Sequence, residues 1–216
     1  MNARRFPLHQ TVLDLQAEGE NALNDWFPIG DSVSTIRICL EDPQHNALAA
    51  ALIVLDAQLA LEDGGIERVD DRLLGDGGVD VNGREGATPA VELRIPRMPS
   101  GAHTAMAAAK SDRTYSAAAR LSLNGDAAVM LVGIAPYPIR ARQIESVVRG
   151  RTLNDRIIDL AAQTARSEAQ PYGVGDLTDG VAVNQVEDAV RRLFRRLRDR
   201  QQDAQPHDSR HPARRR

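Results

Sequence analysis

The sequence contains little cysteine, few aromatic residues and no long apolar run. Cys39 is the only cysteine among 216 residues, which excludes an internal disulfide and an iron–sulfur cluster ligated by this chain alone. Aromatic residues make up 3% of the chain, so the core must be built from Leu, Ile, Val and Ala. No apolar run could span a bilayer, and the first ten residues lack the apolar segment of a signal peptide. We therefore expect a cytoplasmic protein that does not associate with a membrane.

Lysine is also nearly absent, since Lys110 is the only one among 27 basic residues. We attribute the many arginines to the composition of a GC-rich genome. The formal net charge of −3 gives no reason to expect a nucleic-acid partner. The basic run 190–200 (VRRLFRRLRDR) is the one segment that suggests it, but its arginines lie opposite an apolar helical stripe. We interpret them as a solvated face and keep nucleic-acid binding as the third hypothesis.

Motifs of nucleotide-binding, hydrolytic and metal sites are missing too. The sequence contains no P-loop, no G-x-G-x-x-G and no G-x-S-x-G. Its histidines are scattered, and the pair His207 and His211 has zinc-like spacing but no cysteine partner. We therefore predict no metal site and name no catalytic residue.

The first half of the chain is weakly patterned up to residue 45, with a helix expected at 11–27 and a strand at 34–40. An apolar helix then begins at Asn46, followed by a strand in QLALEDGG and by a Gly-Asp-rich stretch at 62–89 that reads as loops around a short ordered piece. VELRIP, 91–96, alternates as a half-buried strand does, and the prolines after it mark a domain boundary near 96–101.

The second half predicts three strands followed by three helices. The strands are expected at 104–111, 115–123 and 127–135, with Asn124-Gly-Asp as a turn. A short helix at 141–148 ends at Gly150, and the next begins near Thr152, which forms a near-capping box with Asp155. The stripes expected to be buried are Leu153, Ile157, Leu160, Ala161 and Thr164 in that helix, and Val186, Val190, Leu193 and Leu197 in the last.

This order of elements predicts an α+β fold. We expect a small α/β unit at 46–100, then a domain at 101–200 with a three-stranded antiparallel sheet and about three helices. The segment 1–45 precedes them, and a disordered basic tail at 201–216 follows them.

One run of this second half carries a family resemblance. Residues 131–165 are similar to the C-terminal domain of the flavoprotein (medium) subunit of molybdenum hydroxylases, the carbon monoxide dehydrogenase and xanthine dehydrogenase group. That domain has a Gly-x-Ala-Pro-x-Pro-x-Arg-Ala turn, which appears here as Gly133 to Ala141, and a short helix that closes on Leu-x-Gly, here Val148 to Gly150. Further matches are Lys110 and Arg113 as a K-x-x-R strand, Asp176 in a loop, and Arg195-Arg196 in the last helix.

The resemblance extends through 46–100, where 51–69 and 91–101 resemble the second subdomain of the family's FAD-binding domain. It implies a subunit that holds FAD between a 2Fe-2S small subunit and a molybdopterin-binding large subunit. Electrons would pass through FAD from the iron–sulfur centres to an external acceptor. In this interpretation Lys110 lies on a strand and stabilises negative charge on the reduced flavin ring, and Arg113 supports it. The alternative is that both are ordinary exposed strand residues.

The sequence departs from the family where the FAD pyrophosphate is bound. The family uses two glycine-rich loops, because glycine lets backbone N–H groups approach phosphates closely. The subdomain that carries the first loop is missing, and Thr35 to Cys39 stands without glycine at the second. Asn46-Ala47 and Asn184-Gln185 also replace family pairs. Two hypotheses follow: a flavoprotein-type subunit active only in a complex, or a truncated, degenerate paralogue without FAD that serves an assembly or protein-interaction role.

Overall fold

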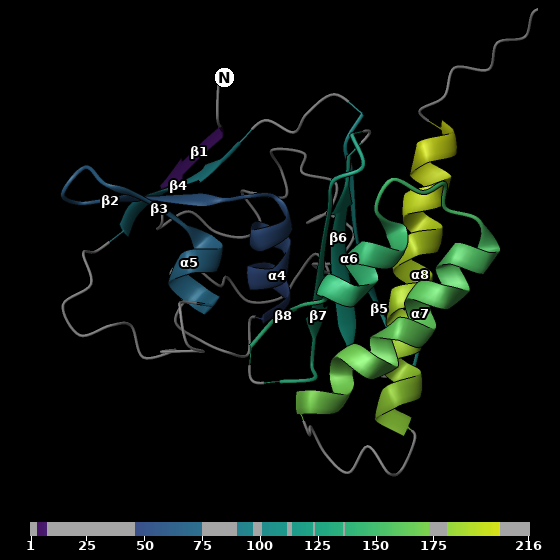
Figure 1. Cartoon of the computed structure of the whole chain (residues 1–216). Coiled ribbons are helices and arrows are strands. Elements are labelled where there is room, and N and C mark those ends of the chain that lie inside the picture. The colour runs from purple at the N-terminus through teal and green to yellow at the C-terminus, as the bar shows by residue number, and fades with distance from the viewer. Residues whose placement is uncertain are drawn as a thin grey trace, which may run out of the picture.

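The computed structural model contains two antiparallel sheets and the helices that pack on them (Figure 1). The structure describes residues 4–7, 46–74, 90–96, 101–111, 114–122, 124–135, 137–172 and 181–203. The predicted helix at 11–27 and the predicted strand at 34–40 lie outside these ranges. The expected α+β class is confirmed.

The first sheet has the order β1-β4-β2-β3. Its central strands are β4 (Ala90–Ile95) and β2 (Gln58–Leu61), which agree with the predicted strands. Its outer strands are β1 (Arg4–Pro7), in a segment that looked weakly patterned, and β3 (Ile66–Arg68). Helix α5 (Val69–Leu74) follows β3, so a short strand and a helical turn form the start of the stretch predicted as loops around an ordered piece.

The second sheet has the order β5-β6-β7-β8, and all of its pairs are antiparallel. The strands β5 (His103–Ala108), β6 (Ser116–Leu121) and β7 (Ala127–Val132) confirm the three predicted strands, although each is shorter than predicted. The prediction missed a fourth strand, β8 (Ile139–Arg140), which follows the proline-rich turn. Its two residues are too few to show an alternating pattern, so only pairing with β7 reveals them.

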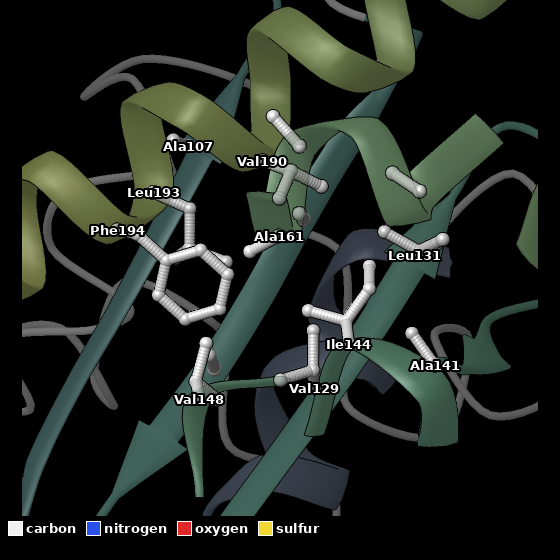
Figure 2. Close-up of a cluster of buried hydrophobic side chains, with 14 of the residues drawn as sticks. Ala107, Val129, Leu131, Ala141, Ile144, Val148, Ala161, Val190, Leu193 and Phe194 are labelled. Carbon is white, nitrogen blue, oxygen red and sulfur yellow. The ribbon is translucent and has the colours of Figure 1, made fainter. Parts of the chain in front are cut away.

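Helices α6 (Arg142–Val148), α7 (Asp155–Ala169) and α8 (Val181–Asp203) cover one face of this sheet (Figure 1). Between α7 and α8 lies a short 3₁₀ turn, η3 (Gln170–Tyr172). The core beneath these helices is aliphatic, as the composition predicted; Phe194 is the one aromatic ring among its described buried residues, and Tyr115 and Tyr137 pack against it partly buried (Figure 2). Alanines of β5 and β6 face it, and their small side chains let the helices approach the sheet closely.

Helix α4 (Asn46–Val54) packs against β6 and β7 on the opposite face of this sheet (Figure 1). Its described side chains are buried around its whole circumference, which is typical of a helix enclosed by other elements. Just beyond the helix, Asp56 has a positive φ of 54° and pairs with Arg120 of β6 and with Arg68 of β3. Its carboxylate therefore links the two sheets.

The prediction for α7 is wrong in part. The N-cap is Asn154, whose side chain accepts a hydrogen bond from the N–H of Ile157 at 3.0 Å, rather than Thr152. Leu160 is 42% exposed, although it was expected in the buried stripe. The stripe that is buried consists mainly of alanine: Ile158, Ala161, Ala162, Ala165 and Ala169. A leucine is a poor guide here, because α7 packs mainly on α6 and α8 and turns its small side chains toward them.

The stripe predicted for α8 is confirmed, since Val186, Val190, Leu193 and Leu197 are all buried. The helix continues to Asp203, so the first residues of the predicted disordered tail are helical. The remaining tail, 204–216, lies outside the described residues.

Candidate functional site

Lys110 lies in the connection between β5 and β6, two residues beyond the end of β5, and its side chain is exposed. The strand was expected to run to 111, but regular pairing ends at Ala108, with one further hydrogen bond from the N–H of Ala109 to the carbonyl of Tyr115 at 2.8 Å. The placement of Lys110 on a strand is therefore wrong by two residues. Its ammonium projects from a loop that starts at the sheet.

Two residues of α8 hold this loop in place. The backbone N–H of Lys110 donates to the carboxylate of Asp188 at 2.8 Å, and the hydroxyl of Ser111 donates to the side-chain oxygen of Gln185 at 2.8 Å. Gln185 and Asp188 are three residues apart, so they lie on the same side of the helix. Gln185, which replaces a family residue, thus has a local structural role.

The second predicted site residue, Arg113, lies outside the described residues, as does Asp176. The prediction that Lys110 and Arg113 together contact the flavin is therefore not tested by the structure.

The outer edge of β5 is closed by arginines of α8. Arg196 donates to the carbonyl of Met106 at 2.6 Å, and Arg200 donates to the carbonyl of Thr104. These carbonyls face away from β6 and would otherwise lack a protein partner at the end of the sheet. The interpretation of the helix arginines as a solvated face is therefore wrong for Arg196. Among the arginines of that prediction, Arg195 is the exposed one.

Other arginines of α8 face α7. Arg191 pairs with Asp159 at 3.0 Å and Arg198 pairs with Asp155 at 2.6 Å. In the reverse sense, Glu187 of α8 pairs with Arg166 of α7 at 2.9 Å. Such exposed ion pairs contribute little stability individually, but they account for charges that looked like a binding surface in the sequence.

The proline–arginine turn is joined to α6 by a buried carboxylate. Glu145 is almost fully buried and accepts hydrogen bonds from the N–H of Val129 at 3.0 Å and from the guanidinium of Arg140 at 2.9 Å. The N–H of Ala141 donates to the carbonyl of Val129 at 2.8 Å. Arg140, the arginine of the motif, is thus bound to the protein's own glutamate.

The described residues include no group of three or more His, Cys, Asp or Glu side chains placed to hold a metal ion. Within the same ranges, no helix has both the length and the apolar character needed to cross a bilayer.

Residues 101–180 match the family model for the CO dehydrogenase flavoprotein C-terminal domain. This segment belongs to that family. The resemblance inferred from the proline–arginine turn is therefore confirmed for this part of the chain. No curated protein matches the sequence.

Solved structures resemble this chain in fold, both in the segment that matches the family model and in the residues before it. A cyanide-inactivated Cu,Mo-CO dehydrogenase has a TM-score of 0.67 at 19% identity, covering 93% of this chain and 79% of that one. CO dehydrogenase from Hydrogenophaga pseudoflava, which lacks the Mo-pyranopterin moiety of the molybdenum cofactor, has a TM-score of 0.61 at 20% identity, with 86% and 66% covered. Quinoline 2-oxidoreductase from Pseudomonas putida 86 has a TM-score of 0.55 at 15% identity, with 84% and 64% covered. The chain thus spans just under two thirds of the length of the last two, and at these identities the likeness shows the fold.

Proposed function

We propose that this chain is a flavoprotein-type subunit of a molybdenum hydroxylase. The observation that carries the proposal is the match of residues 101–180 to a CO dehydrogenase flavoprotein domain. The fold likeness to CO dehydrogenases and to quinoline 2-oxidoreductase supports it. In this role the chain joins a molybdopterin-binding large subunit and a 2Fe-2S small subunit, and it takes part in relaying electrons through FAD to an external acceptor.

Lys110 is the residue proposed to face the flavin ring. Its ammonium is exposed, while its backbone is held by Asp188. A compact, strongly hydrated charge of this kind stabilises the negative charge that a flavin ring gains on reduction. Arg113 is proposed to support it.

Three of the described glycines with positive φ do not fit the pyrophosphate of FAD, whereas Gly150 is open and lies between the exposed Arg149 and Arg151. Gly133 and Gly125 both have positive φ, but a Cβ at either position would meet backbone, of Thr114 and of Gly150 respectively, so neither presents an open surface. Gly64 is open, yet it follows the exposed acids Glu62 and Asp63, which repel phosphate. A single open glycine does not form the pair of glycine-rich loops that the family uses, so we assign the main grip on the pyrophosphate to a partner chain and the contacts to the ring to this one.

Flavin titrations of the purified full chain test this division. If the chain contacts the ring alone, riboflavin and FAD bind with equal affinity, read from the quenching of fluorescence, because the phosphates add nothing. Lys110→Gln weakens both to the same degree, about tenfold for one lost charge-assisted hydrogen bond. The matched control is Arg195→Gln, which removes one exposed positive charge from α8 and leaves both affinities unchanged.

The other outcomes separate the hypotheses. FAD binding far more tightly than riboflavin would show that this chain itself grips the phosphates. No flavin bound, alone or with co-purified subunits, would contradict the redox role and favour the second hypothesis. In that case the chain is a degenerate paralogue that serves assembly or protein interaction.

A further inference from the structure

Helices α6 and α7 lie side by side and run in opposite directions (Figure 1). The loop 149–154 joins the end of α6 to the start of α7. At the other end of the pair, Glu168 of α7 accepts a hydrogen bond from the N–H of Gln143 in the first turn of α6. Because α7 packs mainly on α6 and α8, its remaining side faces outward.

This outward side of α7 carries a stripe of exposed side chains. Its members are Arg156, Leu160, Gln163 and Ser167. They follow one another at spacings of four, three and four residues, which places them in one line along the helix. The positions on either side of the line are turned toward the protein. Asp159 pairs with Arg191 of α8, and Ile157 is half-buried.

The acids of the two helices are all engaged within the protein. Asp155 and Asp159 pair with arginines of α8, and the buried Glu145 and Glu168 each accept a hydrogen bond from a backbone N–H. No carboxylate of α6 or α7 is therefore left to balance a positive charge on their outer face.

Several arginines of the same segment are not engaged. Within the part of the chain that the structure describes, four exposed guanidinium groups have neither an ion-pair nor a hydrogen-bond partner: those of Arg142, Arg149, Arg151 and Arg156. The exposed Asp126 lies in the turn whose Gly125 approaches Gly150, and it offsets one of these charges at most. The outer face of α6 and α7, with the loop between them, is therefore positive at both ends.

Leu160 adds an apolar point between these charges. It is 42% exposed and lies one helical turn after Arg156. A single exposed leucine is ordinary on a protein surface. Here, however, it lies between arginines without partners, and an apolar centre with a charged rim, rich in arginine, is typical of protein–protein interfaces. The sign of the charge indicates an acidic partner.

We propose that the outer face of α6 and α7 docks a helix of a partner protein, which presents acidic side chains to the arginines and an apolar side chain to Leu160. The four-three-four spacing of the stripe is the one along which a second helix packs in a coiled coil. The inference does not depend on flavin binding, because neither Arg156 nor Leu160 belongs to the flavin contact proposed above.

The test measures the binding of a fluorescently labelled helical peptide to the full chain by anisotropy. One face of this peptide carries glutamate and leucine. Two further probes are the same peptide with its leucines replaced by alanine, and a single-stranded DNA of equal net charge. We expect the leucine peptide to bind most tightly of the three, and its affinity to fall as the salt concentration rises.

Two variants test the two kinds of contact. Arg156→Gln weakens the binding of the leucine peptide about fivefold, since it removes one exposed ion pair. Leu160→Ser weakens it about tenfold, since it removes the apolar contact. The matched controls are Arg195→Gln on α8 and Ile66→Ser on β3, whose side chains are also exposed, and both leave the affinity unchanged. Circular dichroism verifies that each variant is folded.

Four results would overturn the proposal. The first is that the leucine peptide does not bind. The second is that the alanine peptide binds as tightly, or that Leu160→Ser binds as the parent does, because attraction between net charges would then explain the binding. The third is a control variant that weakens binding as much as its counterpart. The fourth is tighter binding of the DNA, which would make the arginines a nucleic-acid surface instead.

Discussion

At Gly133 the chain leaves β7 with a backbone conformation that side chains rarely adopt. Its φ is +90°, and a Cβ there would lie well inside 3.0 Å of the carbonyl oxygen of Thr114 and 3.0 Å from its carbonyl carbon. The glycine of the family turn is therefore required by a close approach between the segment after β7 and the connection before β6. The sequence located this glycine through the motif, whereas the clash that explains it depends on where the connection before β6 is placed.

We expect Gly133→Ala to lower the free energy of unfolding by about 2–4 kcal/mol, since it combines positive-φ strain with a backbone clash. Chemical denaturation followed by circular dichroism measures the change. Gly64→Ala is the matched control, because Gly64 has nearly the same φ, +87°, and open space around its Cβ position. It should cost about 1–2 kcal/mol. Equal losses in the two variants would mean that the Thr114 contact does not matter.

Two glutamates show at the same scale what polar residues do inside this fold. Glu145 accepts from the N–H of Val129, and Glu168, at the end of α7, accepts from the N–H of Gln143 in the first turn of α6. Helix α6 has no side-chain cap of its own, so a carboxylate from the next helix supplies one. Both glutamates look like ordinary surface acids in the sequence, because the N–H groups that donate to them come from other elements.

At the scale of elements, α8 combines three faces with different tasks. Its apolar face completes the core, one polar face pairs with α7, and the other closes the edge of β5. The sequence predicted the first of these from its 3.6-residue period. The sequence could not distinguish the two polar faces, because arginines that pair with other groups and arginines that are solvated have the same spacing along the helix.

We expect Arg196→Met to destabilise the domain by about 1–3 kcal/mol, because it leaves the carbonyl of Met106 without this charged donor. Arg195→Met, one residue away and exposed, should change stability by less than about 0.5 kcal/mol. Thermal unfolding of the two variants measures the difference. A loss in Arg195→Met as large as that in Arg196→Met would contradict the assignment of the two faces.

At the scale of the whole molecule, α4 connects the two sheets. It leads directly into β2 of the first sheet, while its side chains pack on β6 and β7 of the second. Asp56 adds an ionic link from the end of the helix to Arg68 and Arg120. The second sheet is thus covered on both faces, which explains why the described residues of β7 are all buried.

We expect Leu52→Ala to cost about 2–5 kcal/mol, because Leu52 is fully buried in α4, the helix that packs on the second sheet. Leu160→Ala removes the same atoms from a side chain that is 42% exposed, and it should cost less than about 1 kcal/mol. Urea denaturation of both variants measures this. If Leu160→Ala were the more costly, the predicted stripe of α7 would be right after all.

The sequence by itself determined the class of the fold, three of the four strands of the second sheet, the buried stripe of α8 and the family resemblance of residues 101–180. Each depends on local periodicity, on turn residues or on a contiguous motif, and these act over a few neighbouring residues. The tertiary structure decided which arginines are bound and where the buried glutamates find their donors. These depend on pairs of groups far apart in the chain, whose distance is set by sheet register and helix packing rather than by spacing along the sequence.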